Sequence, residues 1–203
     1  RDFCLSRGLG DVYKRQYYNS VGYTNQDGVM KGTNYQRYTL QSKQDFKKGI
    51  FQAGTNVVLT YDQSNPLYSV IRGGMVGHTL QAIPTWEQYD ENRTGGYGGL
   101  YGDVVNLTHP LGMVDDNLMK RYSDNVKIFA NAYVSVELMK GLKYKLNLTP
   151  DFQFYRYNSY EGLFDFGLAK HDITAVTEQQ TRTRNILVEN LLTFDRTFGD
   201  HKV

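Results

Sequence analysis

The chain has 203 residues, of which 40% are hydrophobic and 14% aromatic, and its formal net charge is only +2. This length suits one domain of ordinary size. The chain has no run of about 18 apolar residues, which excludes a transmembrane helix, and no apolar stretch follows its early arginines, so no signal peptide is expected there. The 17 Tyr, 10 Phe and 20 Gly, against 4 Pro, favour strands and turns.

The first sixteen residues, RDFCLSRGLGDVYKRQ, differ in character from the rest. They resemble a translated sequencing-adaptor tail, so residues 1–16 are expected to be artefactual or disordered; the alternative is a genuine N-terminal segment. Without their four basic and two acidic residues, the 23 basic and 21 acidic residues fall to 19 of each. The remaining chain is neutral, which predicts no nucleic-acid partner. The single cysteine, Cys4, also lies here, which excludes a disulfide framework elsewhere.

The next strong pattern is an alternation of apolar and mostly polar residues over 126–138. Its apolar face holds Val126, Ile128, Ala130, Ala132, Val134, Val136 and Leu138. Because successive strand residues point to opposite faces, this period of two predicts a strand and leaves no helical alternative. Residues 142–154 repeat the pattern, and Pro150 is predicted to mark a bulge or an edge. The connection between them is predicted as a three-residue turn with Gly141 left-handed, Leu138 opposite Leu142 and Glu137 opposite Lys143.

Further strands are predicted at residues 17–24, 38–46, 51–61 and 185–196, and a new strand begins after a tight turn at 197–201, about seven in all. Short turns near Lys48, Lys140 and Gly199 alternate with long connections at 25–34, 63–124 and 157–182. In an up-and-down meander, alternate connections lie at the same end. Short turns at one end, long loops at the other and one continuous apolar face are typical of an outer-membrane β-barrel.

The alternative is a soluble β-sandwich, and strand length separates the two. Soluble strands usually run about 5–6 residues, whereas a tilted membrane strand needs about 9–11. An apolar row of this length must meet either a protein core or lipid. The opposite face carries charges that suit a wet lumen or a solvated open sheet: Arg37, Lys43, Asp45, Lys127, Glu137, Lys143, Lys145, Asp151, Glu189 and Asp195. Aromatic residues gather at the strand ends, where two membrane-interface belts are expected.

Three segments carry a family resemblance: YYNSVGYTNQDGVMKGTNYQRYTLQSKQ, NAYVSVELMKGLKYKLNL and ILVENLLTFDRTFGDHKV. They resemble barrel strands of SusC/RagA-type TonB-dependent outer-membrane transporters, and IPTWEQYD, GGYGG and NLTHPLG resemble that family's large loop. The resemblance covers residues 17–203. It implies an all-β fold: an antiparallel up-and-down meander that is a partial, open piece of a 22-stranded barrel, with the loop at about 63–124 facing outward.

The same resemblance implies import of glycans or peptides across the outer membrane of a Gram-negative bacterium. Its implied partners are outer-membrane lipid, a SusD-like surface lipoprotein and TonB, which contacts an N-terminal region absent from this chain. The signal peptide, the plug and most strands are also absent, so the chain is expected to be a fragment that cannot transport alone. Whether the substrate is a glycan or a peptide is left open.

Chemistry-bearing residues are sparse. No nucleophile–base pair or G-x-S-x-G motif accompanies the four histidines, so no catalytic residue, cofactor or metal is expected. The glycine run at 95–99 has no phosphate-loop context. The long loop offers candidate ligand contacts, because flat aromatic rings stack on sugars or peptide groups: Trp86, Tyr89, Tyr97 and Tyr101. Packing within the loop is the competing interpretation. A soluble carbohydrate-binding or adhesion module, and more remotely a glycan-degrading enzyme, are the alternative functions.

Overall fold

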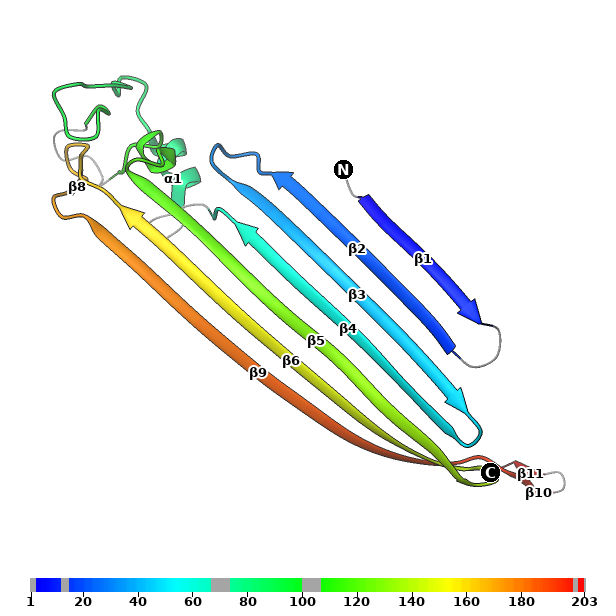
Figure 1. Ribbon diagram of the computed structural model, residues 1–203. Helices are drawn as coiled ribbons and strands as arrows, with labels where there is room; N and C mark the ends of the chain where they lie inside the picture. The colour runs from blue at the N-terminus through cyan, green and yellow to red at the C-terminus, as the bar shows by residue number, and fades with distance from the viewer. Residues whose placement is uncertain (1–2, 12–14, 67–73, 100–106, 199–200, 203) are drawn as a thin grey trace.

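The computed structural model describes residues 3–11, 15–66, 74–99, 107–198 and 201–202. Most of them form one curved, seven-stranded antiparallel sheet in the order β1-β2-β3-β4-β5-β6-β9 (Figure 1). The strands are β1 (Phe3–Asp11), β2 (Arg15–Asp27), β3 (Asn34–Lys48), β4 (Phe51–Ser64), β5 (Met119–Met139), β6 (Leu142–Glu161) and β9 (Ala175–Phe194). The predicted open, up-and-down meander is confirmed.

The remaining elements are short. Helix α1 (Gly74–Gln81) and the 3-10 turn η1 (Gly112–Val114) lie in the connection between β4 and β5. The hairpin of β7 (Phe164–Asp165) and β8 (Lys170–His171) lies between β6 and β9, and β10 (Thr197–Phe198) pairs with β11 (His201–Lys202) at the end of the chain. Among the described residues, no helix has the length and apolar character to cross a membrane.

Strand β1 comes from the segment that the sequence sets apart. Residues 3–11 pair with β2, from Phe3 opposite Tyr23 to Asp11 opposite Arg15, so this backbone continues the meander. The pairing does not bear on the origin of the segment, because an exposed strand edge accepts almost any extended chain. The interpretation of residues 1–16 as a foreign tail therefore stays a prediction.

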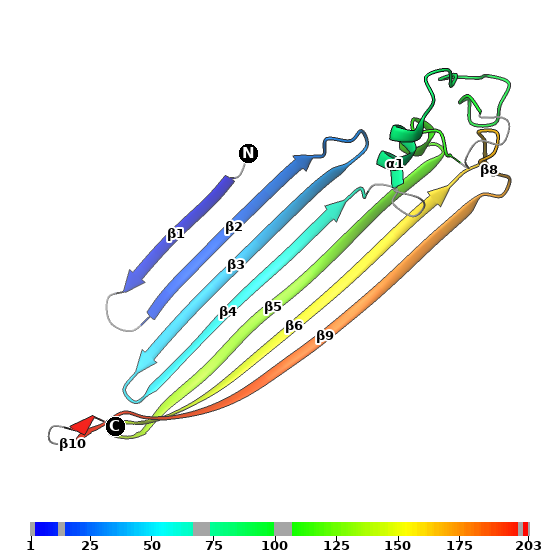
Figure 2. The same cartoon turned by 180° about the vertical axis from the view of Figure 1, so that it is seen from behind.

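The connections sort by length as predicted for the turns near Lys48 and Lys140, whereas the predicted turn at Gly199 lies outside the described residues. The β3–β4 and β5–β6 turns lie at one end of the sheet, called here the turn end, and the long connections lie at the other, the loop end (Figures 1 and 2). Gly49 and Gly141 have φ of 57° and 89°, the left-handed conformation that glycine adopts without strain.

Of the two pairings predicted for the β5–β6 hairpin, one is confirmed and the other is wrong. Glu137 pairs with Lys143, as predicted. Leu138 does not pair with Leu142, because Met139 takes that place and the register shifts between Glu137 and Met139. The turn therefore has two residues rather than three, and Leu138 becomes the extra residue of a bulge.

The prediction that Pro150 marks a bulge or an edge is wrong. Strand β6 lies inside the sheet between β5 and β9, and Pro150 pairs with Ile186. On the other side the register is the same before and after it, with Phe129 opposite Asp151 and Ala132 opposite Leu148. The ladder is interrupted between those pairs, which fits a residue that has no N–H to donate, and the long flanking ladders keep the register.

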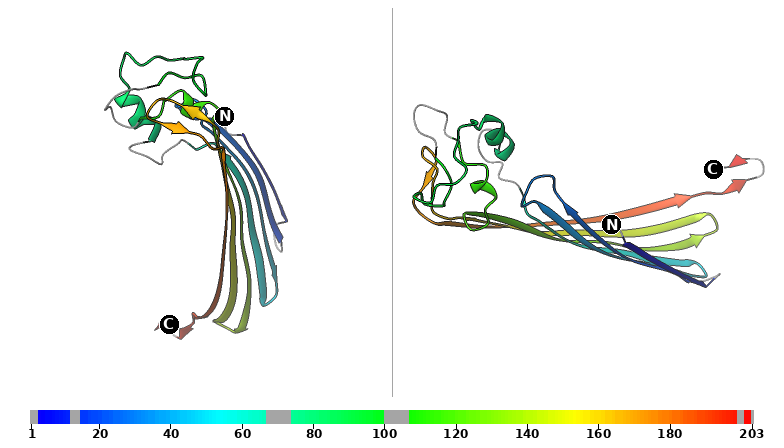
Figure 3. Two further views of the ribbon diagram at one scale, coloured as in Figure 1. Left: turned by 90° about the vertical axis from the view of Figure 1, so that its left-hand side faces the viewer. Right: turned by 90° about the horizontal axis from the view of Figure 1, so that it is seen from above.

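The apolar face is uncovered from β2 to β9. Midway along their strands, the side chains are 42% exposed at Leu148 on β6, 49% at Val134 on β5 and 56% at Val188 on the edge strand β9. Paired residues share a face, so the register joins these rows into one surface from β2 to β9. No second layer of described residues lies on this face; the loops lean over the other one (Figure 3).

The apolar face is skewed relative to the paired rows. On β9 the last large residue of this face at the turn end is Phe194, and on β2 it is Tyr17. Tyr17 lies in the same paired row as Val188, which is six residues from Phe194 toward the loop end. Six residues span about 20 Å along a strand and five strand spacings about 24 Å, so the boundary slopes by about 40°. At the loop end the last large apolar or aromatic residues share one row, from Tyr23 on β2 to Phe154 on β6, so the slope belongs to the turn-end edge alone.

The polar face carries a network around Tyr133. Its hydroxyl donates to Asp45 Oδ1 at 2.8 Å, Gln52 Nε2 donates to that hydroxyl at 3.3 Å, and Lys145 Nζ lies 4.4 Å from the ring centre. Gly54 pairs with both Asp45 and Tyr133. The ring lies across the glycine, which leaves no room for a side chain there.

We expect Gly54→Ala to destabilise the sheet by about 1–3 kcal/mol, the usual cost of overpacking. A Cβ at position 54 would lie 2.5 Å from Tyr133 Cε1 and from Asp45 Oδ1, so the Tyr133–Asp45 hydrogen bond must break or shift. Gly22→Ala is the matched control, since its Cβ would meet only Thr39 Cβ at 3.8 Å. Denaturant titration of the full-length protein in lipid measures both; equal midpoint shifts would contradict this role of Gly54.

Candidate functional site

The long connections form a compact unit at the loop end, called here the loop cluster: residues 74–99, 107–118 and 162–174. Its centre is a set of buried apolar side chains, Met113, Leu118, Met119, Phe164 and Phe166. Met119, Arg121 and Ser123 on β5 are buried, while Lys120 between them is exposed. The buried positions share a face with Lys127 and Tyr133, so the loop cluster packs on the polar face of the sheet.

Arg93 joins the two loops that build the cluster. Its Nε donates to Asp90 Oδ2 at 3.1 Å and its Nη1 donates to Asp165 Oδ1 at 3.0 Å. The Arg93 side chain is only 10% exposed. Asp165 Oδ1 also accepts from the backbone N–H of Gly167 at 2.9 Å, which fixes the β7–β8 turn. The guanidinium of Arg93 thus binds the second loop at Asp165, a residue 72 positions further along the chain.

An aromatic group lies beside this ion pair. His109 contacts the Trp86 ring edge-on with centroids 4.8 Å apart, and the Tyr97 ring at 5.2 Å. Tyr97 also meets Phe166 at 6.0 Å. The Trp86 Nε1–H donates to the carbonyl of Gly98 at 3.0 Å. Trp86 and Tyr97 therefore form part of the interior of the loop cluster.

Titratable groups of the cluster are tuned by burial. Burial, together with the hydrogen bond and charge of Asp115, raises the pKa of Tyr97 to about 12. The Tyr97 hydroxyl donates to Asp115 Oδ2 at 2.9 Å. Burial alone would raise the pKa of Asp115, but hydrogen bonds from Asn117 and Tyr97 outweigh it and the pKa is lowered. At neutral pH the pair is a neutral phenol donating to a carboxylate.

His109 is held as the neutral imidazole. Its Nδ1 accepts the backbone N–H of Leu111 at 3.2 Å, and its Nε2 lies 3.3 Å from the carbonyl of Glu87. The proton therefore belongs on Nε2. Burial lowers the pKa of His109, only partly opposed by the Glu87 carbonyl. Protonation at Nδ1 would place its N–H against the backbone N–H of Leu111, so two donors would face each other.

We expect the loop cluster to loosen under acid conditions. A histidine whose pKa is lowered on folding contributes stability above its ordinary pKa of 6.5, and that contribution is lost as the pH falls through the lowered value. Hydrogen exchange of residues 107–118, corrected for intrinsic rates, should accelerate below that range. His109→Gln has no charge to gain, so its exchange should lack this pH dependence; a parallel acceleration in the variant would exclude His109 as the cause.

The four predicted ligand-binding residues fall into three groups. Trp86 and Tyr97 are half-buried and engaged inside the cluster. Tyr89 is 64% exposed and its ring lies 5.6 Å from that of Tyr97. Tyr101 lies outside the described residues. The structure brings Trp86 and Tyr97 together through His109 and leaves Tyr89 facing outward.

The second loop makes a contribution to the cluster that was not predicted from the sequence. Phe166 is completely buried and stacks against Phe164 at 4.5 Å, yet residues 157–182 were predicted only as a long connection. The alternation Phe164-Asp165-Phe166 is the only local signal, and it is too short to identify a strand. Buried His78 was likewise missed; its Nδ1 accepts from the Thr108 N–H at 2.9 Å.

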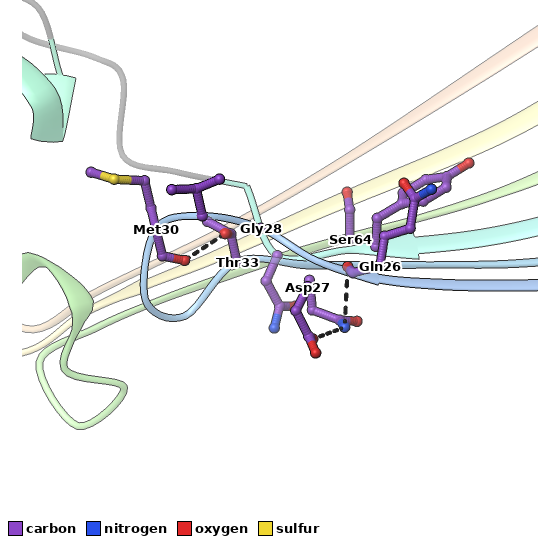
Figure 4. A pocket seen from close by; sticks show the side chains of 10 residues that line it. Gln26, Asp27, Gly28, Met30, Thr33 and Ser64 are labelled. Carbon is purple, nitrogen blue, oxygen red and sulfur yellow. Dashed lines mark hydrogen bonds between the residues drawn. The ribbon is translucent and has the colours of Figure 1, made fainter. Parts of the chain in front are cut away.

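A pocket of about 460 Å³ lies at the β2–β3 connection (Figure 4). Gln26, Tyr35 and Ser64 lie in one row of the polar face and line it together with the connection itself. That connection is closed by the Gly28 N–H donating to the Thr33 carbonyl at 3.0 Å. The pocket lining combines amide and hydroxyl groups with the apolar side chains of Val29 and Met30, so it selects no single class of ligand. In the described part of the chain, no cluster of three or more potential metal ligands occurs.

Comparison with known proteins extends this description. No family model matches the chain. The TonB-dependent receptor P3 of Formosa agariphila is 27% identical over 201 residues, which cover 93% of this chain and 19% of the receptor. Structures of the RagAB peptide importer in the open-open and closed-closed states match with TM-scores of 0.72 and 0.71, at 17% identity, over 98% and 97% of this chain and 22% of the importer chain.

The chain therefore spans about a fifth of the length of these relatives. The relatives are a receptor and an importer, not enzymes, in agreement with the prediction that this chain is no enzyme. Over nearly its whole length, the chain is similar in sequence to a TonB-dependent receptor and has the fold of part of the RagAB importer, which supports the resemblance to SusC/RagA-type TonB-dependent transporters.

Proposed function

We propose that the chain is part of an outer-membrane importer that takes up glycans or peptides, is energised through TonB and works with a SusD-like lipoprotein. Residues 17–203 form part of its barrel, and the connection at about 63–124 faces outward. Outer-membrane lipid of a Gram-negative bacterium is the surrounding medium. The observation that carries the proposal is the apolar face, which is exposed from β2 to β9.

The dimensions of that face fit a bilayer. Residues 126–138 span about 40 Å along the strand, and a tilt of about 40° reduces this to a height of about 30 Å, close to the apolar band of a membrane barrel. Beyond Val126 the same face becomes polar, with Asp124 forming an ion pair with Arg156 at 2.9 Å. The apolar stretch thus ends where a bilayer would.

The soluble-module alternative lacks the layer that it requires. A sandwich would bury the apolar face beneath a second sheet. The described loops instead pack on the polar face, through Met119, Arg121 and Ser123. Lipid is therefore the better partner for the apolar face.

We propose Tyr89 as the leading ligand contact, with Trp86 and Tyr97 positioning it; Tyr101 stays a candidate. The exposed Tyr89 ring presents a flat surface at the loop end, and that surface suits both sugar rings and peptide groups. The RagAB importer carries peptides, which supports the peptide option.

The test is made with the full-length protein in its own bacterium. A deletion strain complemented with the gene should recover uptake of either labelled oligopeptides or labelled oligosaccharides, and loss of TonB should abolish that uptake. The protein should fractionate with outer membranes. Recovery from the soluble fraction, or uptake of both classes unchanged by the deletion, would overturn the proposal.

Tyr89→Ala should reduce that uptake about two- to tenfold, because an aromatic stacking contact is worth roughly 0.5–1.5 kcal/mol beyond its area. Tyr89→Phe keeps the ring and should retain most of the uptake. Equal loss in both variants would assign the effect to the hydroxyl, and no loss in either would remove Tyr89 from the ligand contacts.

A further inference from the structure

The apolar face changes character on β9 before it does so on the neighbouring strands. Its β9 row runs from Phe194 through Leu192 and Val188 to Ile186, and the next two positions on the same face are Arg184 and Arg182. Arg184 pairs with Phe152 and Arg182 with Phe154. Both arginines are exposed. Between Phe194 and Ile186 this row holds one polar residue, Asn190. Two guanidinium groups therefore follow a mainly apolar row.

A third arginine completes the group. Arg156 on β6 pairs with Gln180, diagonal to Arg182, and is exposed on the same face. Its Nε donates to Asp124 Oδ1 at 2.9 Å, and its guanidinium lies 5.9 Å from the Tyr122 ring centre. That ion pair uses one of the five N–H groups of the side chain. Among the described residues, neither Arg182 nor Arg184 forms an ion pair, and Glu178 is the remaining carboxylate on this face of β9.

The position of the three arginines follows from where the apolar face ends at the loop end. Arg182 shares a row with Phe154 and Val126, which end the band on β6 and β5. Tyr23, Tyr38 and Tyr61 share that row too, so the apolar face ends at one level from β2 to β6, and Arg182 lies at this level on β9. Arg184 lies one pair nearer the turn end. Because long arginine side chains extend toward the membrane surface, both guanidinium groups reach the depth of lipid headgroups. Arginine is strongly disfavoured on the lipid face at the bilayer midplane but nearly neutral at the interface.

We propose that Arg182 and Arg184, together with Arg156, form a binding site for the phosphate group of a membrane lipid in the leaflet at the loop end. The proposal rests on the proposed function, since it requires the apolar face to meet lipid. Guanidinium groups bind phosphate oxygens through paired, charge-assisted hydrogen bonds. The acyl chains of the same lipid lie along the apolar rows below, against Ile186 and Val188, so the site takes both parts of the ligand.

The test uses the full-length receptor in phosphatidylcholine nanodiscs doped with phosphatidic acid, or with diacylglycerol as the phosphate-free match. Native mass spectrometry counts the doped lipid that stays bound on release. Basic residues near a charged lipid surface each add to the binding, so losing two should weaken retention of phosphatidic acid roughly thirtyfold. Arg182→Gln/Arg184→Gln should show this loss, and Arg182→Lys/Arg184→Lys should recover most of it. Lys47→Gln/Lys48→Gln removes equal charge at the turn end and should retain phosphatidic acid as the unchanged protein does.

Three results would overturn the site. These are equal retention by the glutamine variant and the unchanged protein, equal retention of diacylglycerol and phosphatidic acid, or displacement of the lipid by millimolar inorganic phosphate, which would identify a solute phosphate site. Because every variant must first enter nanodiscs, a protein that fails to do so contradicts the proposed function, whereas entry without selective retention contradicts only the site.

Discussion

Replacing Val188 with arginine should lower the unfolding free energy of the full-length receptor in a bilayer by about 2–4 kcal/mol, whereas Leu187→Arg should cost far less. The two residues are neighbours on β9 and are similarly exposed in the sheet, at 56% and 53%. Val188 pairs with Leu148 on the apolar face, and Leu187 pairs with Thr149 on the polar face. The difference between the variants therefore reports the medium on each side.

Denaturant titration of both variants in phospholipid vesicles provides the measurement. Val188 lies six residues from Phe194, which places it about 15 Å from the turn-end boundary and near the middle of the hydrocarbon. The penalty should be accompanied by a lower yield of folded protein in outer membranes. Similar costs for the two variants would mean that both faces meet the same medium, as on a solvated open sheet.

The second large effect is expected at Arg93. Arg93→Met should destabilise the loop cluster by about 2–3 kcal/mol, because it leaves Asp90 and Asp165 without the cation that both contact. The cost is discounted from that of a fully buried pair because Asp90 and Asp165 are 23% and 33% exposed. Hydrogen exchange across residues 162–174 should accelerate at least about tenfold.

Lys170→Met is the control in the same loop. Lys170 forms an ion pair with Asp172 at 3.1 Å, and the two side chains are 51% and 68% exposed. Such pairs contribute about 0–1 kcal/mol, so exchange in this variant should stay close to that of the unchanged protein. If Lys170→Met accelerated exchange as much as Arg93→Met, the loop would depend on its charge balance rather than on the Arg93 bridge.

The strands could be predicted because their signal is local. Alternation over residues 126–138 places the centre of β5 correctly, but the strand begins at Met119. Beyond Val126 both faces of the strand carry polar residues, so the period of two fades while the hydrogen-bonded ladder continues. Strand β9 begins at Ala175 for the same reason, ten residues before its predicted start, in a polar stretch that no apolar pattern marks.

The loop cluster could not be predicted because its contacts are distant in sequence. The aromatic residues of the long loop were identified as a functional region, but their packing depends on Phe166 and Asp165 from another loop. Residues that pack together because the sheet brings their loops close produce no periodic pattern in the sequence. At Pro150 the sequence does carry a local signal, which predicts a bulge or an edge. The hydrogen-bonded ladders on both sides of the proline keep the strand in register, so the prediction fails.

The most direct test of lipid contact is a scan of β5 with nitroxide labels. Single cysteines from 126 to 138, in the full-length receptor freed of other cysteines and reconstituted in lipid, would be probed with oxygen and a water-soluble nickel complex. The account predicts that oxygen, which concentrates in lipid, reaches the even positions that include Ile128 and Val134, and that nickel reaches the odd positions that include Lys127 and Tyr133. Even positions shielded from both reagents would reveal protein over the apolar face and contradict the account.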